Sequence, residues 1–361
     1  MMKRTIPKIS LALMAALFLM AASASLRAAE VHLLKPRMAP GYIVGDFVFA
    51  KNGDIWILET PDQPASEGVR GMPLVLAKVN AAGELTEFRE GITGTVAKRG
   101  RHMLIVAPDD SIWFSEEDKI GHLSLQGKIT EFPIDQAALG GIRDIAMDAS
   151  GHIWFNSYKA IGKMARDGVV TVYRVEGEKP IELIDIALET DGSVWFTNVI
   201  NRVGKIDLDG VVTEYAKGIS FGGLGDITPG PERRMWFVAA DGDHIDEIDQ
   251  QGCVTEHYTG GDIIGIAVAP NGAIWFSDSG GHHLGRATAA GKVNELYFEP
   301  ENFLGEDGEK IDFDVNEFLS EKLIFSPDGK LWFLDRQRTT LGRVENLPGL
   351  GESIHLELKI Y

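Results

Sequence analysis

The chain has 361 residues, with 35 Lys and Arg against 53 Asp and Glu, a formal net charge of −18, and one cysteine. This acidic balance argues against nucleic-acid partners and against anionic membrane surfaces, because both carry the same sign of charge. A single cysteine rules out an intramolecular disulfide, so stability has to come from core burial, for which the length is ample.

Residues 1–24 are typical of a secretory signal peptide. Basic residues precede an apolar run from Ile9 to about Ala22, and Ala22-Ser23-Ala24 is a small-residue cleavage site, although a later cut near Ala29 also fits. The run is too short to span a bilayer comfortably, and no second apolar stretch of spanning length follows. We therefore expect a bacterial periplasmic or secreted protein with no membrane insertion after removal of the signal.

Residues 30–361 contain a repeat that recurs with each of the seven tryptophans. The spacings between them are 57, 41, 41, 41, 39 and 57 residues, and six of the seven are followed by Phe. A period of about 41 residues is the size of one four-stranded propeller blade. The tryptophans are Trp56, Trp113, Trp154, Trp195, Trp236, Trp275 and Trp332.

Each copy has the same order of parts. An apolar strand and a glycine turn precede the Trp-Phe strand, and a third strand with a pattern such as Ile161-Gly162-Lys163 leads through a second turn to an outer strand such as 211–215. The pattern predicts an all-β fold, a seven-bladed β-propeller of four-stranded antiparallel blades with the tryptophans packed between blades. The terminal segments 30–35 and 353–361 both have strand character, and either one could complete the seventh blade.

The repeat resembles that of the streptogramin B lyase family, also called virginiamycin B lyase. Residues 192–197 (GSVWFT), 202–206 (RVGKI) and 210–215 (GVVTEY) form one nearly full copy of its blade motif, and the resemblance covers nearly all of residues 30–361. The resemblance implies the propeller fold and an elimination that opens a cyclic depsipeptide, with magnesium assisting a histidine base.

The resemblance also places the family's key residues eleven positions before the tryptophan, with Tyr in the first blade and His in the last two. Gly45, Ile264 and Glu321 hold these positions here, and Asp335 and Arg336 lie near the place of a family glutamate. The histidine base is therefore missing where the family has it. Glu321 would need a raised pKa to replace an imidazole.

One face of the predicted propeller carries the long loops. The inner and third strands both end in tight glycine turns, so these turns share a face, whereas the long insertions 61–72, 89–101 and 298–320 fall on the opposite face. Binding residues concentrate on such loops, although neutral loop growth gives the same pattern. We expect a small molecule, a glycan or a protein to bind at this face.

Acidic residues gather around the central channel on that face. Ten residues before the tryptophan, four blades have aspartate, and these carboxylates are suited to Mg²⁺ or Ca²⁺. Alternatively, each aspartate accepts hydrogen bonds from a neighbouring blade's backbone. The four are Asp46, Asp144, Asp185 and Asp226, and the polar residues at the end of the Trp-Phe strand, candidates for ligand binding, include Glu59, Asn198, Asp278 and Asp335.

Candidates for proton transfer and for cationic contacts are fewer. An imidazole or a carboxyl of raised pKa can move a proton at neutral pH. His102 (at the family's register in blade 2), His283 and Glu321 are the candidate catalytic residues, and Arg143, Lys322 and Arg336 could pair with the carboxylates or bind an anionic ligand.

Two hypotheses therefore remain. The first is a metal-assisted lyase or lactonase acting on a cyclic ester or a sugar-like substrate. The second is a non-catalytic periplasmic propeller that binds a protein or a glycan through the face with the long loops. The sequence contains no nucleotide-binding, haem-binding or zinc-binding motif, so the only cofactor that we expect is Mg²⁺ or Ca²⁺.

Overall fold

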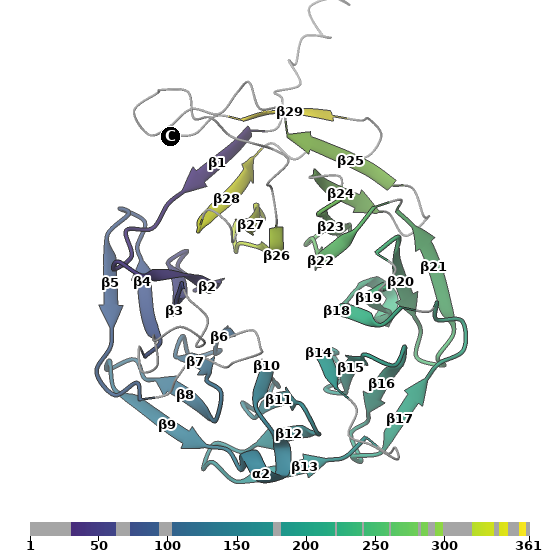
Figure 1. The fold of residues 1–361 in the computed structure, drawn as a ribbon, viewed down its shortest axis with the longest axis horizontal. Coiled ribbons are helices and arrows are strands. Elements are labelled where there is room, and N and C mark those ends of the chain that lie inside the picture. The colour runs from purple at the N-terminus through teal and green to yellow at the C-terminus, as the bar shows by residue number, and fades with distance from the viewer. Residues whose placement is uncertain are drawn as a thin grey trace, which may run out of the picture.

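The computed structural model describes residues 30–62, 73–93, 103–175, 182–220, 222–239, 242–259, 261–280, 283–287, 293–298, 320–335, 339–345 and 354–358. In these ranges the chain is nearly all β, and its blades form a ring (Figure 1). The prediction of a seven-bladed propeller is confirmed. No helix in the described ranges is long and apolar enough to cross a membrane.

The strands of each blade follow chain order from the propeller axis outward. Blade 1 consists of β2 (Tyr42–Phe49), β3 (Ile55–Pro61), β4 (Val75–Val79) and β5 (Leu85–Phe88). Blade 2 consists of β6 (Leu104–Val106), β7 (Ile112–Ser115), β8 (Lys119–Leu123) and β9 (Ile129–Pro133). Blade 3 consists of β10 (Ile142–Met147), β11 (Ile153–Ser157), β12 (Ile161–Met164) and β13 (Val170–Tyr173). Blade 4 consists of β14 (Leu183–Leu188), β15 (Val194–Asn198), β16 (Val203–Ile206) and β17 (Val212–Tyr215). Blade 5 consists of β18 (Leu224–Pro229), β19 (Met235–Ala239), β20 (His244–Ile248) and β21 (Val254–Tyr258). Blade 6 is β22 (Ile263–Val268), β23 (Ile274–Asp278), β24 (His283–Ala287) and β25 (Val293–Phe298). Two short helices, α2 (Gln136–Leu139) and η1 (Pro231–Arg233), lie in connections.

Both terminal strands take part in ring closure. Blade 7 consists of β26 (Ser320–Phe325), β27 (Leu331–Asp335) and β28 (Thr340–Glu345), and its outer strand is the N-terminal β1 (Glu30–Leu34), antiparallel to β28. The C-terminal β29 (Ile354–Leu358) lies between β1 and β25 and runs parallel to both (Figure 1). The N-terminal strand therefore completes the last blade, and the C-terminal strand joins blades 6 and 7 into one sheet.

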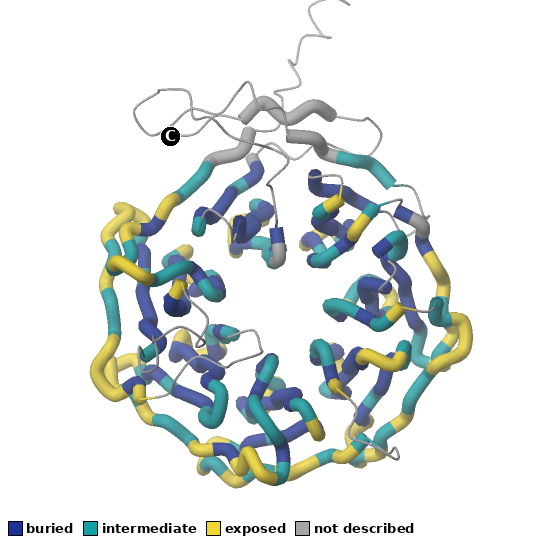
Figure 2. The backbone as a smooth tube through the Cα atoms, viewed as in Figure 1, coloured by how far each residue is buried: buried dark blue, intermediate teal, exposed yellow. Residues whose placement is uncertain are grey.

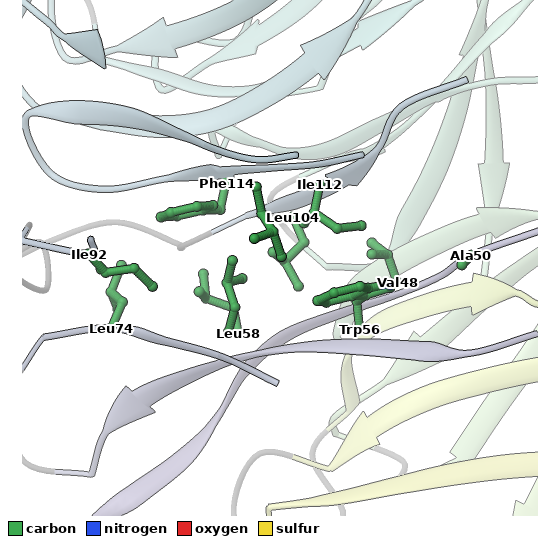
Figure 3. Close-up of a cluster of buried hydrophobic side chains, with 11 residues drawn as sticks. Val48, Ala50, Trp56, Leu58, Leu74, Ile92, Leu104, Ile112 and Phe114 are labelled. Carbon is green, nitrogen blue, oxygen red and sulfur yellow. The ribbon is translucent and has the colours of Figure 1, made fainter. Parts of the chain in front are cut away.

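The hydrophobic core lies between the blades. Figure 3 shows the cluster in which Trp56 and Leu58 of blade 1 pack with Leu104, Ile112 and Phe114 of blade 2. Trp113 of blade 2 packs in the same way with Phe155 and its neighbours in blade 3. The Trp-Phe strands are buried, whereas exposed residues lie at the rim (Figure 2). Each blade therefore buries one face against each neighbour, as the repeat requires.

The glycine of the third strand leaves room for the phenylalanine ring. Gly204 of β16 lies opposite Phe196 of β15, and a Cβ on Gly204 would come within 1.9 Å of the ring's Cζ. Four other blades repeat this close approach, at Gly121, Gly162, Gly285 and Gly342. The Ile-Gly-Lys and Leu-Gly-Arg patterns of the sequence are thus packing requirements, because any larger side chain would displace the ring.

Replacing Gly204 by Ala should therefore destabilise the propeller. Overpacking of this kind costs about 1–3 kcal/mol, which urea or thermal unfolding of Gly204→Ala will measure. In a Phe196→Leu background the same substitution should cost less, because the smaller side chain leaves room for the methyl group. An equal cost in both backgrounds would contradict the contact between ring and glycine.

Candidate ligand site at the propeller axis

A β-bulge in the innermost strand shapes the centre of the propeller. In blades 1, 3, 6 and 7 the pairing with the Trp-Phe strand shifts by one residue at the position eleven before the tryptophan, which is Gly45, Arg143, Ile264 or Glu321. In blades 4 and 5 the shift spans the positions eleven and ten before the tryptophan. A bulge bends its strand and re-aims the side chains beside it. The positions that the family resemblance marks therefore coincide with bulges.

A small cavity of about 150 Å³ lies among these bulges, and we call it the axial cavity. Asp46, Asp185 and Asp226 line it together with Lys322, so three of the four predicted aspartates and one predicted cation come together. Thr228 also lines the cavity, and apolar residues contribute most of the remaining wall, Met103 and Ile266 among them. These two were not predicted from the sequence, because nothing in the repeat pattern distinguishes them from core residues.

Two of the aspartates connect neighbouring blades through backbone hydrogen bonds. Asp46 of blade 1 accepts a hydrogen bond from Leu104 N of blade 2 at 2.7 Å. Asp185 of blade 4 accepts one from Ile227 N of blade 5 at 2.8 Å, and its other oxygen accepts one from Ile186 N at 2.9 Å. The donor in the following blade is in each case the residue nine before the next tryptophan. These carboxylates therefore satisfy backbone N–H groups where the innermost strands of two blades meet.

The seam between blades 7 and 1 replaces an aspartate by a lysine. Lys322 holds the position ten before Trp332, and its ammonium donates to Asp46, with Nζ 5.8 Å from the centre of the Phe47 ring. Asp46 is only 1 % exposed, so this charge-assisted bond operates in a region with little water. Lys322 thus extends the chain of inter-blade contacts across the seam.

The fourth aspartate and the predicted arginine lie in blade 3. Asp144 accepts a hydrogen bond from Ile145 N at 2.7 Å, and its own N–H donates to Asn156 Oδ1. Arg143 forms an ion pair with Glu182 at the start of blade 4 and lies over the Tyr158 ring. Arg143 therefore also links two neighbouring blades.

The polar residues at the end of the Trp-Phe strand lie away from the axial cavity. The residue three after the tryptophan shares its side of the blade with the phenylalanine, so its side chain enters the layer between blades. Asn198 Nδ2, for example, donates to Glu214 Oε1 of the outer strand at 3.3 Å. Glu59, Asn198, Asp278 and Asp335 are all buried there and do not line the axial cavity.

Two of these buried positions carry carboxyl groups with strongly raised pKa values. Burial raises the pKa of Glu59 to about 7, and the nearby Glu87 carboxylate adds to the rise. Burial likewise raises the pKa of Glu116 to about 8, with Glu131 as the neighbouring charge. A neutral carboxyl can donate a hydrogen bond as Asn198 does. The surroundings of Glu59 and Glu116 therefore favour the protonated, neutral form of the carboxyl group.

The remaining predicted residues are only partly described. His283 in β24 is buried, with Nδ1 3.6 Å from Asp278 Oδ2, and it is not among the residues that line the axial cavity. His102 and Arg336 lie outside the described residues, as does most of the three long insertions. Glu321 belongs to β26, but its side chain is also outside the described part.

The described residues do not fit the magnesium site that the resemblance implies. Among them, no group of three or more His, Cys, Asp and Glu side chains is arranged to hold a metal ion. Asp46 already accepts hydrogen bonds from a backbone N–H and from Lys322, and Asp185 accepts two from backbone N–H groups. Gly45 and Ile264 provide no ligand atom in their side chains. We therefore assign no step to a metal.

The family is settled by its sequence profile, which matches residues 76–303, more than half of the chain. The chain belongs to the virginiamycin B lyase family. A comparison with curated proteins gives no match. The match extends over blades 2 to 6 and the outer part of blade 1, so it rests on the repeat itself.

Solved structures of similar fold include members of this family. Virginiamycin B lyase from Staphylococcus aureus is 23% identical, with 88% of this chain and 99% of that chain covered and a TM-score of 0.69. A catalytically inactive histidine-to-alanine variant of it, solved with quinupristin, gives 22% identity, coverage of 88% and 99%, and a TM-score of 0.70. YCF48 bound to D1 peptide is 14% identical, with 90% of this chain and 97% of that chain covered and a TM-score of 0.60. Likenesses at this level of identity show the fold alone.

The buried glutamates make stability depend on pH. The ordinary pKa of a glutamate side chain is 4.5, whereas that of Glu116 in the folded protein is about 8. The folded state therefore holds the proton more tightly, and the unfolding free energy should fall as pH rises through this interval. Glu116→Gln should reduce that fall, because the amide stays neutral, and unfolding midpoints between pH 4 and 9 will measure it.

Asn198→Asp provides the converse variant, since it puts a carboxyl at the same register of blade 4. Its side chain would face Glu214, so the substitution should add a new loss of stability with rising pH. A pH profile of Glu116→Gln that matches the wild type would contradict the neutral form of Glu116.

Proposed function

We propose that this family member is an exported, non-catalytic binding protein that takes a cationic group of a partner protein or peptide at the axial cavity. The observation that supports this most directly is the composition of the cavity wall, with three carboxylates against one lysine. A carboxylate oxygen that accepts one backbone hydrogen bond still has a lone pair for another donor. The overall charge of −18 attracts a basic partner over longer range.

The size of the axial cavity favours a side chain over a whole ligand. Small-molecule sites usually measure about 300–1,000 Å³, whereas this cavity measures about 150 Å³. The terminal part of a lysine or an arginine fits such a space. A peptide-bound structural neighbour, YCF48 with D1 peptide, is consistent with a peptide or protein partner at a propeller face.

The positions of the family's base argue against the family's elimination reaction. Gly45 and Ile264 cannot carry a proton, and two of the carboxylates at the axis, Asp46 and Asp185, serve as hydrogen-bond acceptors between blades. General base catalysis needs a group whose pKa lies near the working pH. We therefore expect purified protein with Mg²⁺ to leave the ring of quinupristin closed, as judged by mass spectrometry.

A titration with matched probes tests the binding proposal. We expect N-acetyl-arginine amide or N-acetyl-lysine amide to shift amide signals of Asp226 and Lys322 in ¹⁵N spectra, and the neutral N-acetyl-norleucine amide to leave them in place. Asp226→Asn should weaken binding by about 3- to 10-fold, since one charge at the cavity is lost. Asp209→Asn, an equal change of charge on an exposed turn, should not weaken it.

Two results would overturn the proposal. Equal shifts with the cationic and neutral probes would show that the cavity does not select charge. Opening of the quinupristin ring, or thermal stabilisation by Mg²⁺ or Ca²⁺ that Asp226→Asn abolishes, would instead support a metal-assisted lyase or lactonase.

A further inference from the structure

Blades 3 and 4 share an arrangement around the tryptophan that blade 7 lacks. In blade 3, Asp148 stands six residues before Trp154 and accepts a hydrogen bond from its indole Nε1 at 3.2 Å. Lys163 Nζ lies 3.4 Å from the same carboxylate and 4.8 Å from the centre of the indole ring. The carboxylate thus satisfies both a buried N–H and a cation over the ring.

Blade 4 repeats this arrangement with a longer side chain. Glu189 stands six residues before Trp195 and accepts from its Nε1 at 3.3 Å. Lys205 Nζ lies 3.9 Å from Glu189 and 5.0 Å from the ring centre. Two blades therefore show where a carboxylate belongs relative to the tryptophan and its cation.

Blade 7 retains the tryptophan and the cation but has no carboxylate at that position. Arg343 lies over the Trp332 ring at 5.5 Å, whereas Ser326 occupies the place six residues before Trp332. The Ser326 hydroxyl donates to Asp328. Trp332 is only 8 % exposed, and its Nε1 has no hydrogen-bond partner among the described residues. A buried N–H without an acceptor is costly. Trp236 Nε1 of blade 5 also has no partner among the described residues, but Trp332 in addition has a cation over its ring and lines a cavity.

An open cavity of about 720 Å³ lies at this place, on the face of the short turns between blades 7 and 1. Its volume is in the usual range for a small-molecule site. Trp332, Ser326 and Arg343 line it on the side of blade 7, and apolar side chains, Phe49 and Val79 among them, line it on the side of blade 1. It is a separate site from the axial cavity, with which it shares no residue.

The charges around this cavity favour an anion. Arg343 and Lys51 line it, together with one acid, Asp328. Lys330 Nζ lies 3.5 Å from Asp328 and offsets the charge of that carboxylate, whose pKa the Ser326 hydrogen bond lowers. Lys51 lies 3.9 Å from Asp110 of blade 2 and is largely exposed.

We propose that this cavity binds a small carboxylic acid with an apolar body, whose carboxylate takes the place that Asp148 and Glu189 hold in blades 3 and 4. The carboxylate would accept the Trp332 N–H and lie beside Arg343, while the apolar body would cover Phe49 and Val79. Binding of this kind supplies the acceptor that the chain itself does not, and it buries apolar surface in the same step.

The indole N–H signals in ¹⁵N spectra report on this site directly, because Trp332→Phe identifies the signal by its disappearance. We expect benzoate and hexanoate to move the Trp332 signal downfield and to leave the Trp154 and Trp195 signals unchanged. Benzamide, the neutral counterpart of benzoate, should bind at least about 10-fold more weakly, because hydrogen bonds to a charged acceptor are the stronger ones.

Three variants separate the proposed contact from general effects on the fold. Trp332→Phe keeps an aromatic ring but removes the donor, so the affinity for benzoate should fall about 10-fold. Ser326→Asp restores the carboxylate of blades 3 and 4, so it should abolish benzoate binding and raise the melting temperature without ligand. Trp154→Phe, which removes an N–H that already has its acceptor, should leave benzoate affinity unchanged.

The proposal fails if no acid moves the Trp332 signal, or if benzoate and benzamide move it equally. Unchanged benzoate affinity in Trp332→Phe would also overturn it. Should Ser326→Asp not fold, Arg343→Gln serves in its place, and equal binding of benzoate to Arg343→Gln and wild type would contradict the role of the cation.

Discussion

The hydrogen bond between an aspartate of one blade and the backbone N–H of the next accounts for much of what is found at the propeller axis. Bulges interrupt the regular ladder in the innermost strands of six blades, and a buried backbone N–H at this edge needs an acceptor. Asp46 and Asp185 provide that acceptor for Leu104 and Ile227. At these two junctions the carboxylate therefore has a structural role before any ligand is considered.

This requirement changes how acidic residues at the axis should be interpreted. A group of carboxylates around a central cavity invites a metal-binding interpretation, yet the oxygens of Asp46 and Asp185 already have donors in the protein. Lys322 likewise forms a contact between blades, because it binds Asp46 across the seam between blades 7 and 1. At the outer edge, β1 completes blade 7 and β29 joins that blade to blade 6. The family's scaffold is thus retained, while the axis carries a different set of side chains from the one that the resemblance implies.

The sequence predicted the fold well because the packing unit repeats. Six Trp-Phe pairs, five of them spaced by 39 to 41 residues, indicate a core that is built from a repeated unit, and the third-strand glycines follow from the same contact. It could not decide which terminus completes blade 7, because 30–35 and 353–361 have similar strand character and the pairing joins residues far apart in the chain. The structure resolves this by using β1 in the blade and β29 between blades.

The candidate site was predicted only in part. The four aspartates were found as a column of the repeat, and both the metal-binding and the inter-blade interpretations remained open. Glu59 and Asn198 were expected beside the aspartates, but strand alternation directs them into the layer between blades. The cavity at Trp332 was not predicted, because a carboxylate stands six residues before the tryptophan only in blades 3 and 4, as Asp148 and Glu189, and the other five blades have Ala, Gly or Ser there. Ser326 becomes informative only once blades 3 and 4 show what a carboxylate at this position binds.

Hydrogen exchange at two backbone amides tests the inter-blade role of the aspartates most directly. We expect Asp185→Ala to lower the protection of the Ile227 amide and leave that of Leu104 unchanged, and Asp46→Ala to do the reverse, because each carboxylate serves one amide of the following blade. Unchanged protection of both amides in both variants would contradict the structural role of these carboxylates.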